Sequence, residues 1–199
     1  MLLTRYLAES ALQEAYTANP GPWADHSRYV AQACEAIAQR CPHLDGDSAY
    51  IYGMLHDIGR YAGVTSERHL VDGYRYCKAR GWDKAAQICI THAFMIPDIN
   101  TSIGVFDMPP EDKAFLAEFV KNTPYDDYDR LVQLCDGLAL PSGFCLLEER
   151  FVDVTLRYGF CDATIPRWKA VLDIKAHFEA ILGCSIYTLL PGVVENSFR

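Results

Sequence analysis

The chain contains six side chains of the types that bind transition metals, and two of them are adjacent. They are His26, His56, Asp57, His69, His92 and Asp136. The pair His56-Asp57 ends an apolar run at residues 49–55, and Asp136 lies inside a second apolar run at residues 131–140. An ionised carboxylate buried in such surroundings without a partner costs several kcal/mol. A metal ion would remove that cost, and imidazole together with carboxylate suits Fe, Mn, Ni, Co or Zn.

The spacing of these residues restricts where an ion can lie. Neighbouring residues on a helix point about 100° apart, so His56 and Asp57 can share an ion only near the end of their helix. Three further helices must then bring His26, His92 and Asp136 to that point. A single histidine is most simply explained as a surface or hydrogen-bonded residue, but the ordered set favours a metal site.

The order His, His-Asp, Asp resembles the HD superfamily of metal-dependent phosphohydrolases, over the span from His26 to Asp136. The resemblance implies an all-α HD-domain bundle in which the motif residues hold one or two divalent transition-metal ions. In relatives with two ions, such as bacterial diadenosine tetraphosphate hydrolases and cyclic-dinucleotide phosphodiesterases, two intervening histidines complete a second site. His92 and His69 are the candidates here, although His69 follows the His-Asp pair sooner than in those relatives.

Three arginines are candidates for binding a phosphate. Arg60 follows Asp57 by three residues, where many phosphate-cleaving relatives carry Lys or Arg. A guanidinium there would hold a phosphate through two parallel hydrogen bonds and stabilise charge on the transferred group. Arg28 and Arg68 are further candidates for substrate binding. Asp57 is expected to take part in catalysis too, because a carboxylate that bridges two ions also orients the nucleophile.

These residues predict hydrolysis of a phosphoester or phosphoanhydride in a small molecule, most plausibly a nucleotide, with a metal-activated water as nucleophile. Two alternatives stay open. Some proteins of HD fold hold a di-iron centre and act as oxygenases on C–C or C–P bonds, which a complete set of six ligands would permit. A non-catalytic module that binds a nucleotide is expected where ligands have been lost, and here all of them are present.

Helical periodicity dominates the chain, and strand-like alternation is scarce. Helices are expected at residues 4–18, 23–40, 66–80, 83–93, 111–121, 127–140, 146–158 and 166–182. Asp47 or Ser48 should cap a further helix that ends at the His-Asp pair, with Gly59 in the left-handed position after it. Residues 96–110 contain three prolines and form a long loop of the kind that often acts as a lid. We therefore expect one all-α domain over residues 1–199, with the motif at about 20–140 and C-terminal helices at about 141–185 packed on it.

Other polar residues have structural explanations. Asp126, Asp127 and Asp129 stand where a helix should begin, and they suit capping and the positive end of the helix dipole. His43 and His177 are expected on the surface. The charged segment at residues 148–157 fits solvated pairs one helical turn apart.

The composition excludes several classes of partner. The 199 residues are 50% hydrophobic and 22% charged, with a formal net charge of −8. That charge disfavours nucleic-acid polymers and anionic membranes, but a metal can still attract a small phosphorylated substrate.

Eight cysteines without CxxC spacing favour buried free thiols in a reducing compartment. Neither a signal peptide nor an apolar stretch of about 18 residues is found, so we expect a cytoplasmic protein, with a homodimer left open.

Overall fold

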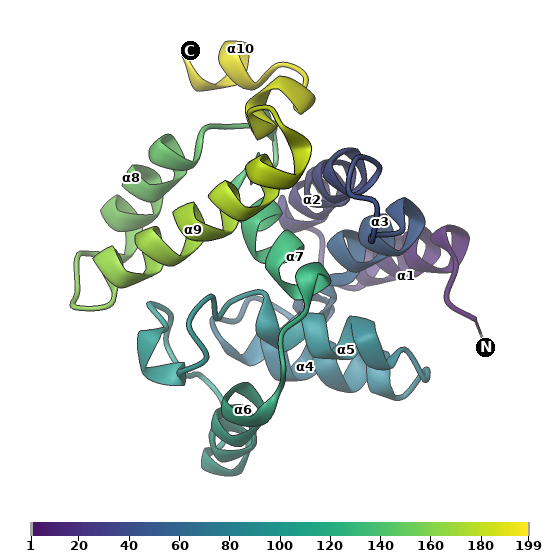
Figure 1. Ribbon diagram of the computed structural model, residues 1–199. Coiled ribbons are helices and arrows are strands. Elements are labelled where there is room, and N and C mark those ends of the chain that lie inside the picture. Colours follow the sequence, from purple (N-terminus) through teal and green to yellow (C-terminus); the bar gives the residue numbers. More distant parts are fainter. Residues whose placement is uncertain (1, 199) are drawn as a thin grey trace.

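Helices make up most of the chain in the computed structural model, which describes residues 2–198 (Figure 1). The α-helices are α1 (Arg5–Ala18), α2 (Trp23–Ala38), α3 (Gly46–Leu55), α4 (Arg68–Lys78), α5 (Asp83–Thr91), α6 (Pro110–Asn122), α7 (Asp127–Gly137), α8 (Leu147–Tyr158), α9 (Thr164–Leu182) and α10 (Val193–Ser197). Short 3-10 helices are η1 (Ile58–Ala62), η2 (Ile99–Thr101) and η3 (Ile186–Leu189). The strands β1 (Ala139–Leu140) and β2 (Gly143–Phe144) pair antiparallel in a small hairpin. The predicted all-α class is confirmed, and no helix among residues 2–198 combines the length and apolar character needed to cross a membrane.

Two predicted helix starts were tested by their caps. The Asp126 carboxylate accepts from the backbone N–H groups of Tyr128 and Asp129, and the Asp129 carboxylate accepts from the N–H of Asp126, which confirms the cap of α7. The cap predicted for α3 is wrong by two or three residues. Asp45 caps this helix by accepting from the N–H of Ser48, so the helix starts earlier than Asp47 or Ser48.

Two glycines are required by close helix packing. The prediction of a left-handed Gly59 is wrong, because Gly59 is not among the described glycines with a positive φ angle. The chain instead runs from α3 directly into η1, which contains Gly59. A Cβ on Gly59 would lie 2.0 Å from the carbonyl oxygen of His69. A Cβ on Gly53 would lie 2.8 Å from the Cα of Ala31. Only glycine lets α2 approach α3, and α4 approach η1, this closely.

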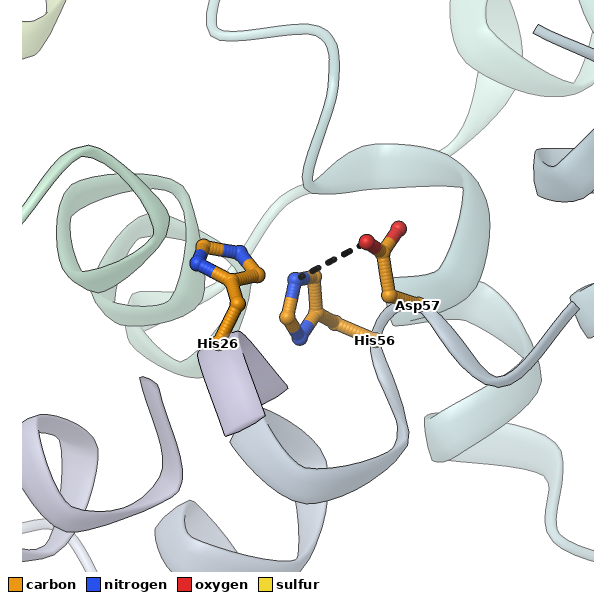
Figure 2. Close-up of side chains that lie close together, drawn as sticks. All are labelled: His26, His56 and Asp57. Carbon is orange, nitrogen blue, oxygen red and sulfur yellow. Dashed lines mark ion pairs between the residues drawn. The ribbon is translucent and has the colours of Figure 1, made fainter. Parts of the chain in front are cut away.

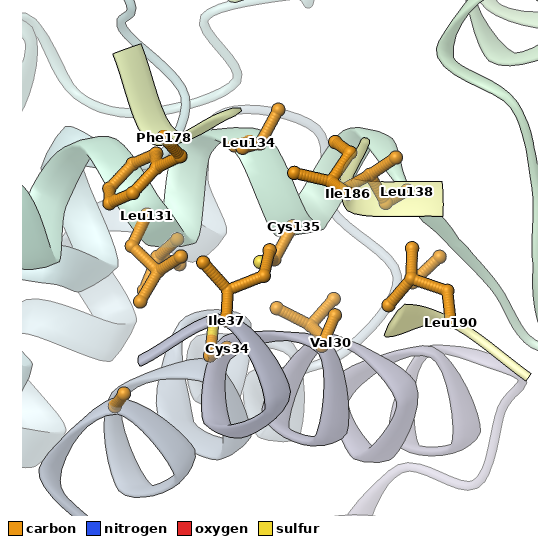
Figure 3. Close-up of a cluster of buried hydrophobic side chains, with 14 of the residues drawn as sticks. Val30, Cys34, Ile37, Leu131, Leu134, Cys135, Leu138, Phe178, Ile186 and Leu190 are labelled. Carbon is orange, nitrogen blue, oxygen red and sulfur yellow. The ribbon is translucent and has the colours of Figure 1, made fainter. Parts of the chain in front are cut away.

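Three clusters of buried apolar side chains hold the helices together. The first joins α2, α7, α9 and η3, and Figure 3 shows Ile37 of α2 facing Leu131 of α7. The second joins α1, α2, α3 and α5, and the third joins α4, α5 and α6. Because α9 places Val171 and Phe178 in the first cluster, the C-terminal segment shares a core with α2 and α7.

Candidate metal centre

The structure brings all six predicted ligands together from five helices. His26 lies in the first turn of α2, the His-Asp pair lies between α3 and η1, and the others come from α4, α5 and α7. Figure 2 shows His26 and His56 pointing toward the same space beside Asp57. All six residues have little or limited solvent exposure. His26 Nε2 lies 2.9 Å from Asp136 Oδ1. His56 Nε2 lies 4.0 Å from Asp57 Oδ2 and also 4.0 Å from Asp136 Oδ1. Asp57 Oδ1 lies 3.1 Å from His69 Nε2 and 3.7 Å from His92 Nε2.

All four histidines use Nδ1 to hold a backbone carbonyl. A carbonyl oxygen can only accept, so each Nδ1 carries a proton and donates it. In a neutral imidazole the other nitrogen, Nε2, then presents a lone pair. In metal-binding histidines, a hydrogen bond from the ring nitrogen that does not face the metal fixes both the orientation and the tautomer of the ring. The bonds join His26 to Ala139 at 3.2 Å, His56 to Gly53 at 2.7 Å, His92 to Ile88 at 3.0 Å, and His69 to Ser66.

The convergence of these lone pairs requires a cation. His26 Nε2 and Asp136 Oδ1 are both acceptors in this tautomer, and so are His69 Nε2 and Asp57 Oδ1. Two acceptors at about 3 Å repel each other unless a proton or a metal ion lies between them. Among the buried atoms of residues 2–198 that have no hydrogen-bond partner are His56 Nε2 and the same Asp57 Oδ1. The donor set and these unpaired atoms therefore fit a divalent transition metal.

Geometry places five of the six candidates, all but Asp136, in two groups that share one residue. The ligand atoms of His26, His56 and Asp57 lie within 4.8 Å of one another, and so do those of Asp57, His69 and His92. Both groups are buried. Asp57 is therefore the residue placed to contact ions on both sides.

Comparison with known proteins agrees with this geometry. A family model for the HD domain matches residues 23–140, which include every ligand candidate. The chain belongs to the HD-domain family. HD domains are for the most part metal-dependent hydrolases, and the His and Asp groups of this HD domain can hold a metal ion. No curated protein and no solved structure shows a significant match to the chain.

The two carboxylates among the candidate ligands, those of Asp57 and Asp136, are strongly biased toward the ionised form. Burial by itself would raise the pKa of Asp57, but Arg60, His69 and His56 outweigh it and hold the pKa well below the usual range. Burial acts on Asp136 in the same direction and is outweighed by His26, His56 and His92, whose protonated forms attract this carboxylate and hold its pKa well below the usual range. Both carboxylates are thus charged at neutral pH and available to a cation.

The metal-free HD domain should lose stability as the pH falls from 7 to 4. Burial lowers the pKa of His92 from 6.5 to about 4, and it lowers the pKa of His56 as well. The unfolded chain, with ordinary histidines, binds more protons than the folded chain in this window, so acid favours unfolding. For His92 alone the loss is about 3 kcal/mol. Melting temperatures of EDTA-treated protein across this pH range check the sign, and a constant or rising melting temperature would contradict it.

A buried polar network fixes α5 against α7 and thereby sets His92 relative to Asp136. The fully buried carboxylate of Asp129 accepts from Thr91 Oγ1 at 2.6 Å and from Lys84 Nζ at 2.7 Å. Gln133, one turn later, donates to the Thr91 carbonyl at 2.8 Å. Asp129 therefore does more than the capping predicted from sequence, because it also anchors the residue that precedes His92.

The three predicted phosphate-binding arginines lie in different surroundings. The Nε atom of Arg60 donates to Asp57 Oδ2 at 2.6 Å, and its Nη2 lies 3.5 Å from His69 Nε2, so this side chain adjoins the metal centre. Arg68 is half-exposed and pairs with Asp72 at 3.1 Å. Arg28 pairs with Asp25 and lines a separate groove with residues of α1 and α3. Among these three, the structure brings only Arg60 to the ligands.

Sequence reasoning missed a fourth arginine beside the centre. Arg167 of α9 lines a pocket together with Asp136, and its Nη1 donates to the carbonyls of Ala93 and Thr101, each at 3.1 Å. Thr101 belongs to the predicted loop at residues 96–110, which is also tied down where Asp107 accepts from the N–H groups of residues 66 and 68. The loop therefore packs on α9 and on the segment that precedes His69.

The remaining predicted surface histidines are exposed, as expected. His43 and His177 both approach the Asp127 carboxylate, at 2.6 Å and 3.3 Å. All eight cysteines are free among the described residues, and six of them are buried.

Proposed function

We propose that this HD domain is a metal-dependent phosphohydrolase that cleaves a phosphoester or phosphoanhydride in a small molecule. The observation that carries the proposal is the set of four imidazole Nε2 atoms and two ionised carboxylates facing one buried space, with a guanidinium alongside. Phosphoryl transfer is accelerated mainly by positioning and by positive charge near the transferred oxygens. Those are the two properties that this group of residues combines.

The chain's own residues account for binding and orientation. The bonds from Nδ1 to backbone carbonyls hold the imidazoles in place, and Asp57 stands between the two ligand groups. Arg60 places a positive charge beside Asp57, where it can donate to phosphoryl oxygens. When bound, a divalent transition metal supplies Lewis-acid character and lowers the pKa of a water molecule.

The size of the substrate follows from the surroundings of the centre. A pocket beside Asp136 provides space for a small organic group. The formal charge of −8 disfavours a nucleic-acid polymer, which would need an extended basic surface. A small phosphorylated molecule such as a nucleotide is the substrate class that we propose, with a cytoplasmic location.

The proposal is tested by metal analysis and a phosphate-release screen. Freshly purified protein is analysed for Fe, Mn, Ni, Co and Zn, then depleted of metal and reconstituted with each ion or with Mg. Anaerobic release of inorganic phosphate from a panel of nucleotides and sugar phosphates is expected with at least one redox-inert ion. Oxygen consumption by a protein that holds two irons, without phosphate release, would instead indicate a di-iron oxygenase.

A further inference from the structure

The pocket next to the metal centre is built mainly by the part of the chain beyond the family match. Its cavity volume is about 100 Å³, which is small beside the ~300–1,000 Å³ of typical small-molecule sites, so it accepts only a compact group. Met95, Ile103, Asp136 and Gly137 come from the part of the chain within the family match, and the other lining residues come from α8, α9 and Gly159 between them. Because the HD match ends at residue 140, these walls are a feature of this chain rather than of the family motif. A molecule held at the metal centre can extend into this pocket through the side formed by Asp136.

Arg167 gives the pocket an unmatched positive charge. Within residues 2–198, no carboxylate lies within ion-pairing distance of its guanidinium, and its two protein hydrogen bonds both come from Nη1 and go to backbone carbonyls. Burial lowers the pKa of Arg167, and the charges of the nearby Glu67 and Asp136 carboxylates offset this effect only in part. The other arginine in the wall, Arg150, is paired with Asp153 at 3.0 Å. The free donors of Arg167 are therefore suited to an anion that enters with the ligand.

The rest of the wall is apolar and aromatic. Phe151 of α8 and Trp168 of α9 stack with ring centroids 5.2 Å apart and an interplanar angle of 9°. Val154 and Val171 continue this surface. Such a wall suits a compact organic group with little polar surface between its charged ends.

We propose that this pocket is the specificity site of the enzyme and that its substrate carries two anionic groups. The phosphoryl group that reacts lies at the metal centre, a compact apolar group lies against Phe151 and Trp168, and the second anion binds Arg167. The inference rests on the proposed function, because the pocket is assigned to the organic part of the phosphorylated substrate. It narrows the substrate class from small phosphorylated molecules such as nucleotides to compact phosphate esters that carry a second anion.

Binding of product-like probes tests the pocket without turnover. We would titrate the metal-loaded protein with 4-hydroxybenzoate and with its neutral analogue 4-hydroxybenzamide, and follow the fluorescence of Trp168. The protein with Trp168→Phe identifies the part of the signal that comes from the pocket. The carboxylate is expected to bind about tenfold or more tightly than the amide, as a charge-assisted hydrogen bond predicts. Equal affinity for the two probes would overturn the proposal.

Variants assign that preference to Arg167. Arg167→Gln should bind the carboxylate probe as weakly as the wild type binds the amide, so the preference disappears. Arg167→Lys should retain part of the preference for the carboxylate. The matched control is Arg157→Gln, on the exposed surface of α8, where the guanidinium pairs with Asp153 at 2.8 Å. It should bind the probes like the wild type. A preference for the carboxylate that survives in Arg167→Gln would mean that another cation, such as the metal, holds the probe, and would refute the assignment.

A second variant keeps the test valid if Arg167→Gln does not fold. Val154→Phe fills the pocket and leaves Arg167 in place, so it should weaken both probes by about tenfold or more. Binding of both probes at wild-type strength would show that they do not occupy the pocket.

A kinetic comparison separates failure of this inference from failure of the proposed function. With phenyl phosphate and 4-carboxyphenyl phosphate as substrates, Arg167→Gln should raise KM about tenfold or more for the carboxylated ester alone. Phosphatase activity that is equally affected on both esters would refute the two-anion inference while leaving the hydrolase intact. Absence of phosphate release from any substrate would contradict the proposed function, and the probe titration would still report on the pocket.

Discussion

Replacing Asp57 with asparagine should remove nearly all bound metal and lower phosphatase activity by about 10³-fold or more. The carboxylate belongs to both ligand groups, with Oδ1 lying 3.1 Å from His69 Nε2 and Oδ2 lying 4.0 Å from His56 Nε2. An amide of the same shape cannot offer a charged ligand to either side. Metal content per chain and the rate of phosphate release measure the two effects.

Two comparison variants make the Asp57 result specific. Asp25→Asn makes the same chemical change at an exposed ion pair with Arg28, and it should keep wild-type metal content and activity. His92→Ala removes a ligand from one group only, so a protein that binds two ions should fall to about one per chain. If Asp57→Asn retains its full metal content, Asp57 is not a shared ligand and the proposed centre is wrong.

The helical class and the candidate ligands were accessible from sequence because both rest on local patterns. The 3.6-residue apolar period predicts helices, and the order of histidines and aspartates predicts the centre. The cap of α7 was also local, since Asp126 and Asp129 lie three residues apart on adjoining turns. The cap of α3 could not be predicted to the residue, because Asp45, Asp47 and Ser48 are all suitable capping residues. Only the backbone conformation of the folded chain makes Asp45 the cap.

The features that bring the ligands together are not local. Nothing in the sequence around Gly59 shows that the carbonyl of His69 lies against it, so its left-handed assignment was a reasonable but wrong use of a local rule. The burial of Asp129 depends on Lys84 and Thr91, which lie on a different helix. Such contacts between distant segments decide the site's geometry, and periodicity carries no information about them.

Arg167 illustrates the same limit at the substrate pocket. Its place in the apolar pattern of α9 is that of an ordinary half-exposed helix residue. No neighbouring residue in the sequence suggests a binding site. Its partners are the carbonyls of Ala93 and Thr101, which lie 74 and 66 residues away along the chain. The signal that could have found it is weak, because it is only a basic residue four positions before Val171, the first α9 residue in the hydrophobic core.

Replacing Arg60 with alanine should lower activity by about 10²-fold or more while most of the metal stays bound. A guanidinium cannot coordinate a cation, so its direct role must be toward the carboxylate or the substrate. The contact of Nε with Asp57 Oδ2 at 2.6 Å leaves Nη1 free among the described residues, and the side chain keeps 31% of its surface exposed. Those remaining donors are therefore accessible to phosphoryl oxygens.

The test for Arg60 compares metal content, melting temperature and kcat/KM in three proteins. Arg60→Lys retains the charge but loses the planar fork, so its activity should lie between those of the wild type and Arg60→Ala. Arg68→Ala is the matched control, because that guanidinium pairs with Asp72 and should leave both metal and rate unchanged. Wild-type turnover in Arg60→Ala would show that Arg60 does not act on the substrate. Loss of metal in the same variant would show that its bond to Asp57 holds a ligand in place.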